Sequence, residues 1–167
     1  MGTPLVDTRK ANRRVLKFAS IAELSAELDA IERAHRAGTL RATGNWHAGQ
    51  ICDHMAKIWE FSLDGFPAEA KPPLWIIVLC RPFKWRAASG STLRAGFTLP
   101  PEAAFMLPTA GCTVESGLAR MRKAIARVTA GERCEKRSPL FGSMSHTQWL
   151  GLHFGHAQLH LSFLHYA

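Results

Sequence analysis

The sequence lacks any apolar run long enough to cross a membrane. Its longest uninterrupted apolar stretch, Leu74–Cys80, is far shorter than the about 20 residues that a membrane-spanning helix requires. Arg13-Arg14 is similar to the start of a twin-arginine export signal. Four acidic residues interrupt the hydrophobic core that such a signal would need: Glu23, Glu27, Asp29 and Glu32. We therefore expect a cytoplasmic location and no membrane partner.

Paired cysteines are also absent. The four cysteines are widely spaced and form no C-x-x-C motif, which argues against a zinc ribbon or a thioredoxin-like redox site. In a reducing compartment such cysteines normally stay reduced and pack as small apolar side chains. We expect a structural role for all of them: Cys52, Cys80, Cys112 and Cys134.

Acidic residues are scarce, with 13 Asp and Glu against 21 Lys and Arg, and the net charge is +8. A basic domain attracts nucleic acid, but specific binding also needs a recognisable reading element. The sequence has no zinc-finger spacing, no RNP motif and no aromatic residues interleaved with a basic stripe. The charges form scattered groups instead, so we expect a solvated basic surface and no nucleic-acid partner: Arg9–Lys17, Arg81–Arg94, Arg120–Arg127 and Arg133–Arg137.

What the sequence does contain is enough apolar material for one folded domain. Its 167 residues are 47% hydrophobic and 20% charged, a composition typical of a globular protein. We find no internal repeat and no low-complexity tract. The chain is therefore predicted to form a single domain, residues 1–167.

Four segments show the 3.6-residue spacing of apolar side chains that is typical of amphipathic helices. Ser20 with Glu23, and Ser145 with Gln148, form capping boxes that mark two helix starts. Asn45 is the candidate N-cap of another helix. The predicted helices cover residues 20–38, 46–64, 114–131 and 145–165, so the fold class is expected to be all-α.

A long connection, Phe66–Cys112, separates the second and third of these helices. Leu74–Trp85 is predicted to form an extra helix that Pro82 kinks, and the remainder is rich in turn-forming residues. Such a long connection is uncommon in a compact domain and often forms a lid or the wall of a pocket.

Histidines occupy the apolar faces of two predicted helices. His156 and His160 have i, i+4 spacing, which places both rings on one helix face about 6 Å apart along the axis. His54 lies on the apolar stripe of the second helix. Three such imidazoles suit a divalent metal with open coordination positions, as in catalytic sites. The alternatives are structural core histidines, or a pairing of His153 with His156. A thermolysin-like site is excluded because Ala157 stands where H-E-x-x-H needs Glu.

These motifs resemble those of the DinB/YfiT-like metalloenzymes. The stretch Gly44–Ala56, with His54, is similar to the second-helix motif of that superfamily, and residues 156–164 are similar to its last-helix H-x-x-x-H element. Further features resemble a branch of unknown function: Arg14-x-Leu16-x-Phe18, Gly96-Phe97-x-Leu99-Pro100, Pro139-x-Phe141-Gly142 and Trp149.

The resemblance implies a DinB/YfiT-like four-helix bundle in which His54, His156 and His160 bind a divalent metal ion, nickel or zinc. It also implies thiol transfer, isomerisation or amide hydrolysis on a small molecule, a low-molecular-weight thiol as cosubstrate, and a homodimer. In the thiol-using members, characteristic residues follow the last histidine ligand. This sequence has Leu161-Ser162-Phe163 there instead, so it gives no support for a thiol cosubstrate.

The leading hypothesis is a metal-dependent transferase or hydrolase acting on a small molecule. The alternative is a metal- or ligand-binding stress protein without turnover. No catalytic acid or base stands out, because Asp53, Glu60 and Asp64 point away from the inward face of their helix. His153 is open to three interpretations: a group that supports the metal ligands, a proton carrier or a surface residue.

Overall fold

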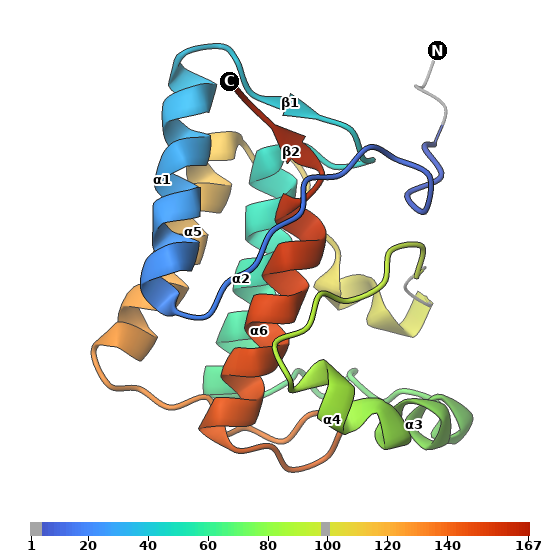
Figure 1. The fold of residues 1–167 in the computed structure, drawn as a ribbon. Coiled ribbons are helices and arrows are strands. Elements are labelled where there is room, and N and C mark those ends of the chain that lie inside the picture. Colours follow the sequence, from blue (N-terminus) through green and yellow to red (C-terminus); the bar gives the residue numbers. More distant parts are fainter. Residues whose placement is uncertain (1–4, 98–100) are drawn as a thin grey trace.

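The computed structural model describes residues 5–97 and 101–167, so Leu99 and Pro100 of the motif above lie outside the described residues. The chain is mostly helical, which confirms the all-α prediction. Four long helices lie side by side (Figure 1): α1 Ile21–Arg36, α2 Ala48–Asp64, α5 Val114–Thr129 and α6 His146–Leu161. The only strands of the described residues form a short antiparallel pair, β1 Arg41–Ala42 and β2 Leu164–His165.

Side-chain caps fix the helix starts. The Ser20 and Ser145 hydroxyls accept hydrogen bonds from the third residue of α1 and α6, as predicted, and Thr113 does the same for α5. The predicted N-cap of α2, Asn45, was wrong. His47 caps that helix because its Nδ1 accepts from the Gly49 and Gln50 amides, whereas Asn45 pairs with the backbone of Val6.

Two glycines allow α2 and α5 to pack at very short range. A Cβ atom on Gly117 would lie 2.1 Å from the Gly49 carbonyl oxygen, and a Cβ atom on Gly49 would lie 2.1 Å from the Thr113 carbonyl oxygen. Both distances are far below van der Waals contact. The backbones of the two helices therefore touch where they cross, and no other residue fits at either position.

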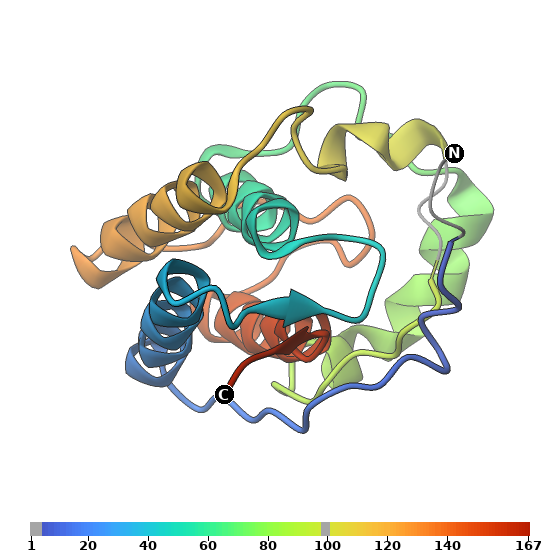
Figure 2. The ribbon, with the colours of Figure 1, turned by 90° about the horizontal axis from the view of Figure 1, so that it is seen from above.

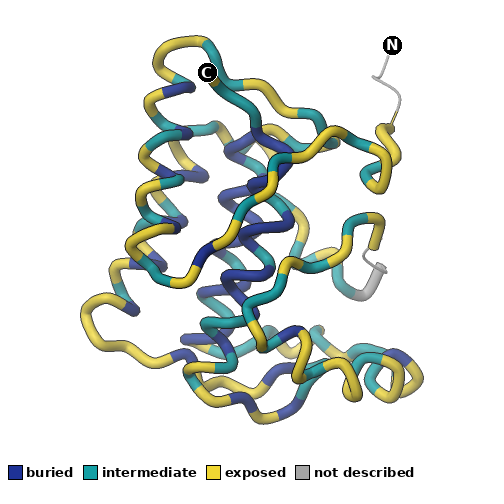
Figure 3. The backbone as a smooth tube through the Cα atoms, in the orientation of Figure 1, coloured by how far each residue is buried: buried dark blue, intermediate teal, exposed yellow. Residues whose placement is uncertain are grey.

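α6 is enclosed on nearly every side. α1 and α2 flank it, and the N-terminal segment and the connection cover its remaining sides (Figures 1 and 2). Figure 3 shows that buried residues continue along most of its length. A helix that is buried on nearly every side is expected to be apolar throughout, apart from residues with partners.

The predicted end of α6 at His165 was wrong, because the helix ends at Leu161. The Ser162 hydroxyl donates to the Leu159 carbonyl. The chain then leaves the helical path, and Leu164–His165 pairs with β1. The Thr43 amide also donates a hydrogen bond to the Phe163 carbonyl. Strand pairing thus takes the place of the last predicted helical turn.

The long connection is partly helical, as predicted, and its helix is interrupted at Pro82. It contains α3 Leu74–Cys80, the 3₁₀ turn η1 Arg81–Phe83, α4 Lys84–Ala87 and the 3₁₀ segment η2 Pro101–Met106. After α4 the chain runs against α6. The two backbones touch there, since a Cβ on Gly151 or Gly155 would lie 2.0 or 2.3 Å from a carbonyl oxygen of the connection.

Arginines of α5 join the helices at the surface. Arg122 contacts Asp29 of α1 at 2.6 Å, and Arg127 contacts Asp64 of α2 at 2.6 Å. The arginines of residues 120–127 thus lie at the surface, as expected, but they are paired with carboxylates. No helix within the described ranges is both long and apolar enough to cross a membrane.

The glycine contact between α2 and α5 gives a prediction with an unusual sign. Replacing a helical glycine by alanine normally stabilises a protein by about 0.4–1 kcal/mol. Gly117→Ala should instead destabilise this fold by roughly 1–3 kcal/mol, because the new methyl group overlaps the Gly49 carbonyl. The measurement is urea unfolding, with the exposed Lys123→Ala on the same helix as control. Stabilisation by Gly117→Ala would contradict the close crossing.

Candidate metal centre

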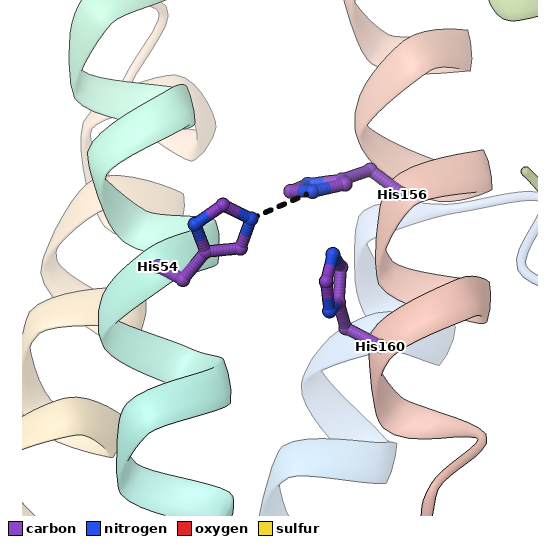
Figure 4. Close-up of side chains that lie close together, drawn as sticks. All are labelled: His54, His156 and His160. Carbon is purple, nitrogen blue, oxygen red and sulfur yellow. Dashed lines mark hydrogen bonds between the residues drawn. The ribbon is translucent and has the colours of Figure 1, made fainter. Parts of the chain in front are cut away.

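Three histidines from two helices meet at one point of the core. His54 comes from α2, and His156 and His160 come from α6 (Figure 4). One ring nitrogen of each lies within 4.8 Å of the others, and His54 Nε2 is 3.1 Å from His156 Nε2. The structure thus places together the three histidines that the sequence predicted as metal ligands. Their role as metal ligands stays a prediction.

The orientation of His54 is held by a backbone carbonyl. His54 Nδ1 lies 2.6 Å from the Met106 carbonyl oxygen, which can only accept a hydrogen bond. Nδ1 therefore carries the hydrogen, and the lone pair of the neutral ring is on Nε2, the atom that faces His156. A second partner of this kind orients metal-bound histidines in proteins.

All three rings are kept neutral by their surroundings. Burial lowers the pKa of His54, and the Met106 carbonyl partly offsets this effect. Burial also holds the pKa of His156 and His160 well below the ordinary value, and the neighbouring imidazoles lower it further. Neutral imidazole is the form that binds a metal, so these rings do not need to lose a positive charge first.

The chemistry and spacing of the cluster suit a divalent ion. Nickel and zinc both accept imidazole nitrogen, and zinc–nitrogen bonds are about 2.0–2.1 Å long, so two ligands of a tetrahedral ion lie about 3.4 Å apart. The 3.1 Å between the Nε2 atoms of His54 and His156 is close to this spacing. His54 is buried, whereas His156 and His160 are partly exposed. The three residues can hold a metal ion.

An aromatic wall borders the cluster. The Trp46 indole stacks on His160 with ring centroids 5.6 Å apart, and it lies 5.0 Å from the His54 ring. Trp46 directly precedes the cap of α2. The capping interaction at His47 therefore also positions the tryptophan beside the cluster.

The end of the long connection is clamped to α2 next to His54. Asp53 accepts from the Thr109 amide at 2.7 Å and is paired with Arg120 at 2.8 Å, and Lys57 donates to the Leu107 carbonyl. These contacts hold the Met106 carbonyl in place. This arrangement could not be predicted from the sequence, because every residue has a backbone carbonyl and residue type does not show which one contacts His54.

The carboxylates of α2 are occupied elsewhere, as the sequence analysis expected. Asp53 and Glu60 both pair with Arg120, and Asp64 pairs with Arg127. Within the part of the chain that the structure describes, no Asp or Glu joins the three-histidine cluster.

His153 lies one level further along the interface between α2 and α6. Its ring is fully buried, stacks on Trp59 with centroids 4.3 Å apart and places Nε2 3.0 Å from the Ser62 hydroxyl. The surface interpretation of His153 was therefore wrong. Because the Ser62 hydroxyl donates to the Trp59 carbonyl, His153 Nε2 is the donor in this pair, and its Nδ1 has no partner among the described residues.

The remaining histidines have local structural partners. His35 lies 2.7 Å from a Glu115 carboxylate oxygen, His146 accepts from the Cys134 amide, and His165 contacts the Asn12 carbonyl. All four cysteines are free thiols, and burial raises the pKa of Cys52 to about 12. These findings agree with the structural role expected for the cysteines.

Residues 10–167 match a family described as a protein of unknown function, DUF1569. The chain belongs to the DUF1569 family. No curated protein and no solved structure gives a significant match.

The assignment to the DinB/YfiT-like superfamily was wrong, because the matching family is DUF1569 and no DinB/YfiT family matches. The reason is physical. An H-x-x-x-H pair that faces a single histidine on a neighbouring helix can bring three imidazoles together in any helical bundle. The motif alone therefore does not identify a family. The thiol cosubstrate and the homodimer were implied only by that resemblance and lose their basis.

The buried His153 predicts how stability depends on pH. Burial lowers its pKa to about 3, against 6.5 for the free side chain. Between these values the unfolded chain takes up a proton that the folded chain does not, so stability falls as pH falls from 6.5 to 3. His153→Phe should reduce the slope of unfolding free energy against pH by about 1.4 kcal/mol per pH unit near pH 5.

Urea unfolding at several pH values measures this slope. Ser62→Ala is the matched control, because it removes the hydrogen-bond partner of His153 but keeps the buried imidazole, and it should retain the wild-type slope. An unchanged slope in His153→Phe would show that His153 is protonated in the folded protein.

Proposed function

We propose that this DUF1569 protein is a metal-dependent enzyme, a transferase or hydrolase, that acts on a small molecule at a divalent ion bound by His54, His156 and His160. The four long helices would serve as the bundle that holds the site, with nickel or zinc as the ion. The observation that carries the proposal is the convergence of three neutral imidazoles, in which His54 is oriented by the Met106 carbonyl.

A divalent ion with three neutral ligands keeps its double charge and lowers the pKa of water or thiol bound to it, which generates a nucleophile near neutral pH. The residues of this chain supply the setting. Met106 holds the hydrogen on His54 Nδ1, so that Nε2 stays available. Trp46 forms an apolar wall beside His160, and a substrate would have to approach from the side on which His156 and His160 are partly exposed.

A binding protein without turnover is the second candidate, and one observation favours it. Among the described residues no carboxylate joins the cluster, and Asp53 is fully occupied by Arg120, Lys57 and Thr109. Among the described residues the cluster therefore has no carboxylate that could serve as a general acid or base.

Metal analysis tests the site directly. Protein purified without a histidine tag and incubated with nickel or zinc should contain about one ion per chain, the stoichiometry of a three-histidine site. His54→Ala should weaken binding by more than the roughly 10–100-fold typical of losing an outer-shell partner. The measurement is calorimetric titration together with elemental analysis.

The double variant His35→Ala/His165→Ala is the matched control, because it removes two histidines that lie outside the cluster, and it should bind like the wild type. Equal metal content in His54→Ala and the wild type would contradict the proposed ligands. Cobalt(II) absorption adds a readout of coordination that does not depend on activity.

Turnover separates the two candidate functions. Metal-loaded protein is assayed against a panel of activated esters, amides and electrophiles with and without a small thiol. Activity that rises in proportion to bound metal and disappears in His54→Ala is the expected result for an enzyme. Full metal occupancy with no turnover across the panel would favour the binding protein.

A further inference from the structure

The connection presents an apolar face to solvent. Six large side chains of α3, η1 and α4 are between 59% and 75% exposed: Leu74, Trp75, Val78, Leu79, Phe83 and Trp85. On α3 their spacing is i, i+1, i+4, i+5, which forms a single stripe. The opposite side of α3 holds Ile76, which is buried. α3 is thus apolar on both sides, with one side packed on the protein and the other turned toward solvent.

This face lies at one edge of the molecule, apart from the four long helices (Figures 1 and 2). The apolar residues border a shallow groove on α3 and η1. Scattered exposed apolar side chains are normal on protein surfaces, whereas a contiguous group that includes two tryptophans marks an interaction site. The described residues leave this face exposed to solvent, so something other than these residues would be needed to cover it.

The charged residues of the segment that forms the apolar face are all basic. Between Glu69 and Glu102 the sequence has no acidic residue, but it has five basic ones: Lys71, Arg81, Lys84, Arg86 and Arg94. Lys84 donates to the Ser143 carbonyl, and the Arg81 guanidinium lies beside Gly142. Arg137 also reaches this turn, at 3.4 Å from the Ser143 hydroxyl. Within the described ranges no carboxylate pairs with Arg81, Lys84 or Arg137, unlike the arginines of α5.

We propose that this face binds the surface of an anionic lipid bilayer, with α3 lying in the plane of the interface. Tryptophan, phenylalanine and leucine on one side with lysine and arginine beside them is the pattern of an interfacial helix. The apolar stripe enters the boundary between headgroups and acyl chains, and the cations meet the lipid phosphates. The indole rings of Trp75 and Trp85 suit this boundary because they are both apolar and polar.

A second copy of the chain is a poorer occupant of the same face. In a symmetric dimer the face would meet itself, so the unpaired cations of both copies would lie against one another. An anionic lipid surface neutralises these charges instead. The shape also fits, because a helix of seven residues is only about 10 Å long and cannot span the bilayer, but it can lie on it.

The sequence expectation of no membrane partner came from the shortness of the apolar run, which excludes a spanning helix and nothing else. The proposal does not depend on the metal site, which lies on other elements. If the membrane proposal fails, the metal-site proposal is not affected, and the reverse also holds.

Vesicle sedimentation tests the proposal with the full chain. Binding is measured to vesicles of phosphatidylcholine alone and to vesicles with about 30% phosphatidylglycerol, at low and high salt. We expect clear binding to the anionic vesicles, much weaker binding to the neutral ones, and a loss of affinity with added salt.

Two variants separate the apolar and the charged contributions. Trp75→Asp/Leu79→Asp should weaken binding by more than about tenfold, because two apolar anchors are lost. Arg81→Gln/Arg86→Gln should weaken binding to anionic vesicles by about fivefold per removed cation and leave neutral vesicles unaffected. All four side chains project into solvent, and circular dichroism and thermal unfolding check that each variant stays folded.

The controls alter matching residues elsewhere on the surface. Val15→Asp changes an apolar side chain that is 99% exposed in the N-terminal segment. Arg33→Gln/Arg36→Gln removes the same net charge from α1. Both should bind anionic vesicles like the wild type.

Three results would overturn the proposal. The first is no binding to either vesicle. The second is equal loss of binding in the control variants and the face variants, which would mean non-specific attraction of a basic protein. The third is a dimer in analytical ultracentrifugation that Trp75→Asp/Leu79→Asp dissociates, without vesicle binding, which would assign the face to a second copy.

Discussion

The enclosure of α6 is the constraint on which the rest of this structure depends. A helix surrounded on nearly every side cannot leave polar groups to water, so each polar side chain on it needs a partner from a neighbouring element. Gln158 meets Thr92 and the Gly90 carbonyl, Trp149 donates to the Lys136 carbonyl, and His153 donates to Ser62. His156 meets His54 of α2 at 3.1 Å, and His160 stacks on Trp46.

Two levels of histidine therefore lie between α2 and α6, and their environments differ. At one level His153 is sealed between two tryptophans and has no path to solvent. At the other level His156 and His160 are partly exposed and share their space with His54. Chemical identity is the same at both levels, so access and the number of converging nitrogens distinguish a structural histidine from a candidate ligand.

The sequence predicted those parts of the fold that depend on local interactions. Capping boxes and apolar periodicity located the starts of α1 and α6 and most of their length, because caps and helix faces are encoded within a few residues. It failed where distant segments compete. α6 ends early because β2 pairs with β1, and Asn45 does not cap α2 because the backbone of Val6 occupies its side chain. Neither partner is visible from the local sequence.

The candidate site shows the same division. The inward positions of His54, His156 and His160 follow from helical spacing, and the structure places them together. The Met106 carbonyl and the clamp at Asp53 were beyond prediction, since they depend on the path of the long connection. His153 was ambiguous for a related reason. An enclosed helix has no solvent-facing side that would mark where its apolar stripe ends, so periodicity alone could not assign the ring to core or surface.

The enclosure of α6 also has a consequence for how the chain folds during synthesis. α1, α2 and α5 are made before α6, so they leave the ribosome while the helix that completes the core is still missing. Until then the apolar sides of three helices have only one another to cover them, and the contacts that complete the core join residues far apart in the chain. The chain is therefore expected to complete its core only after α6 has emerged.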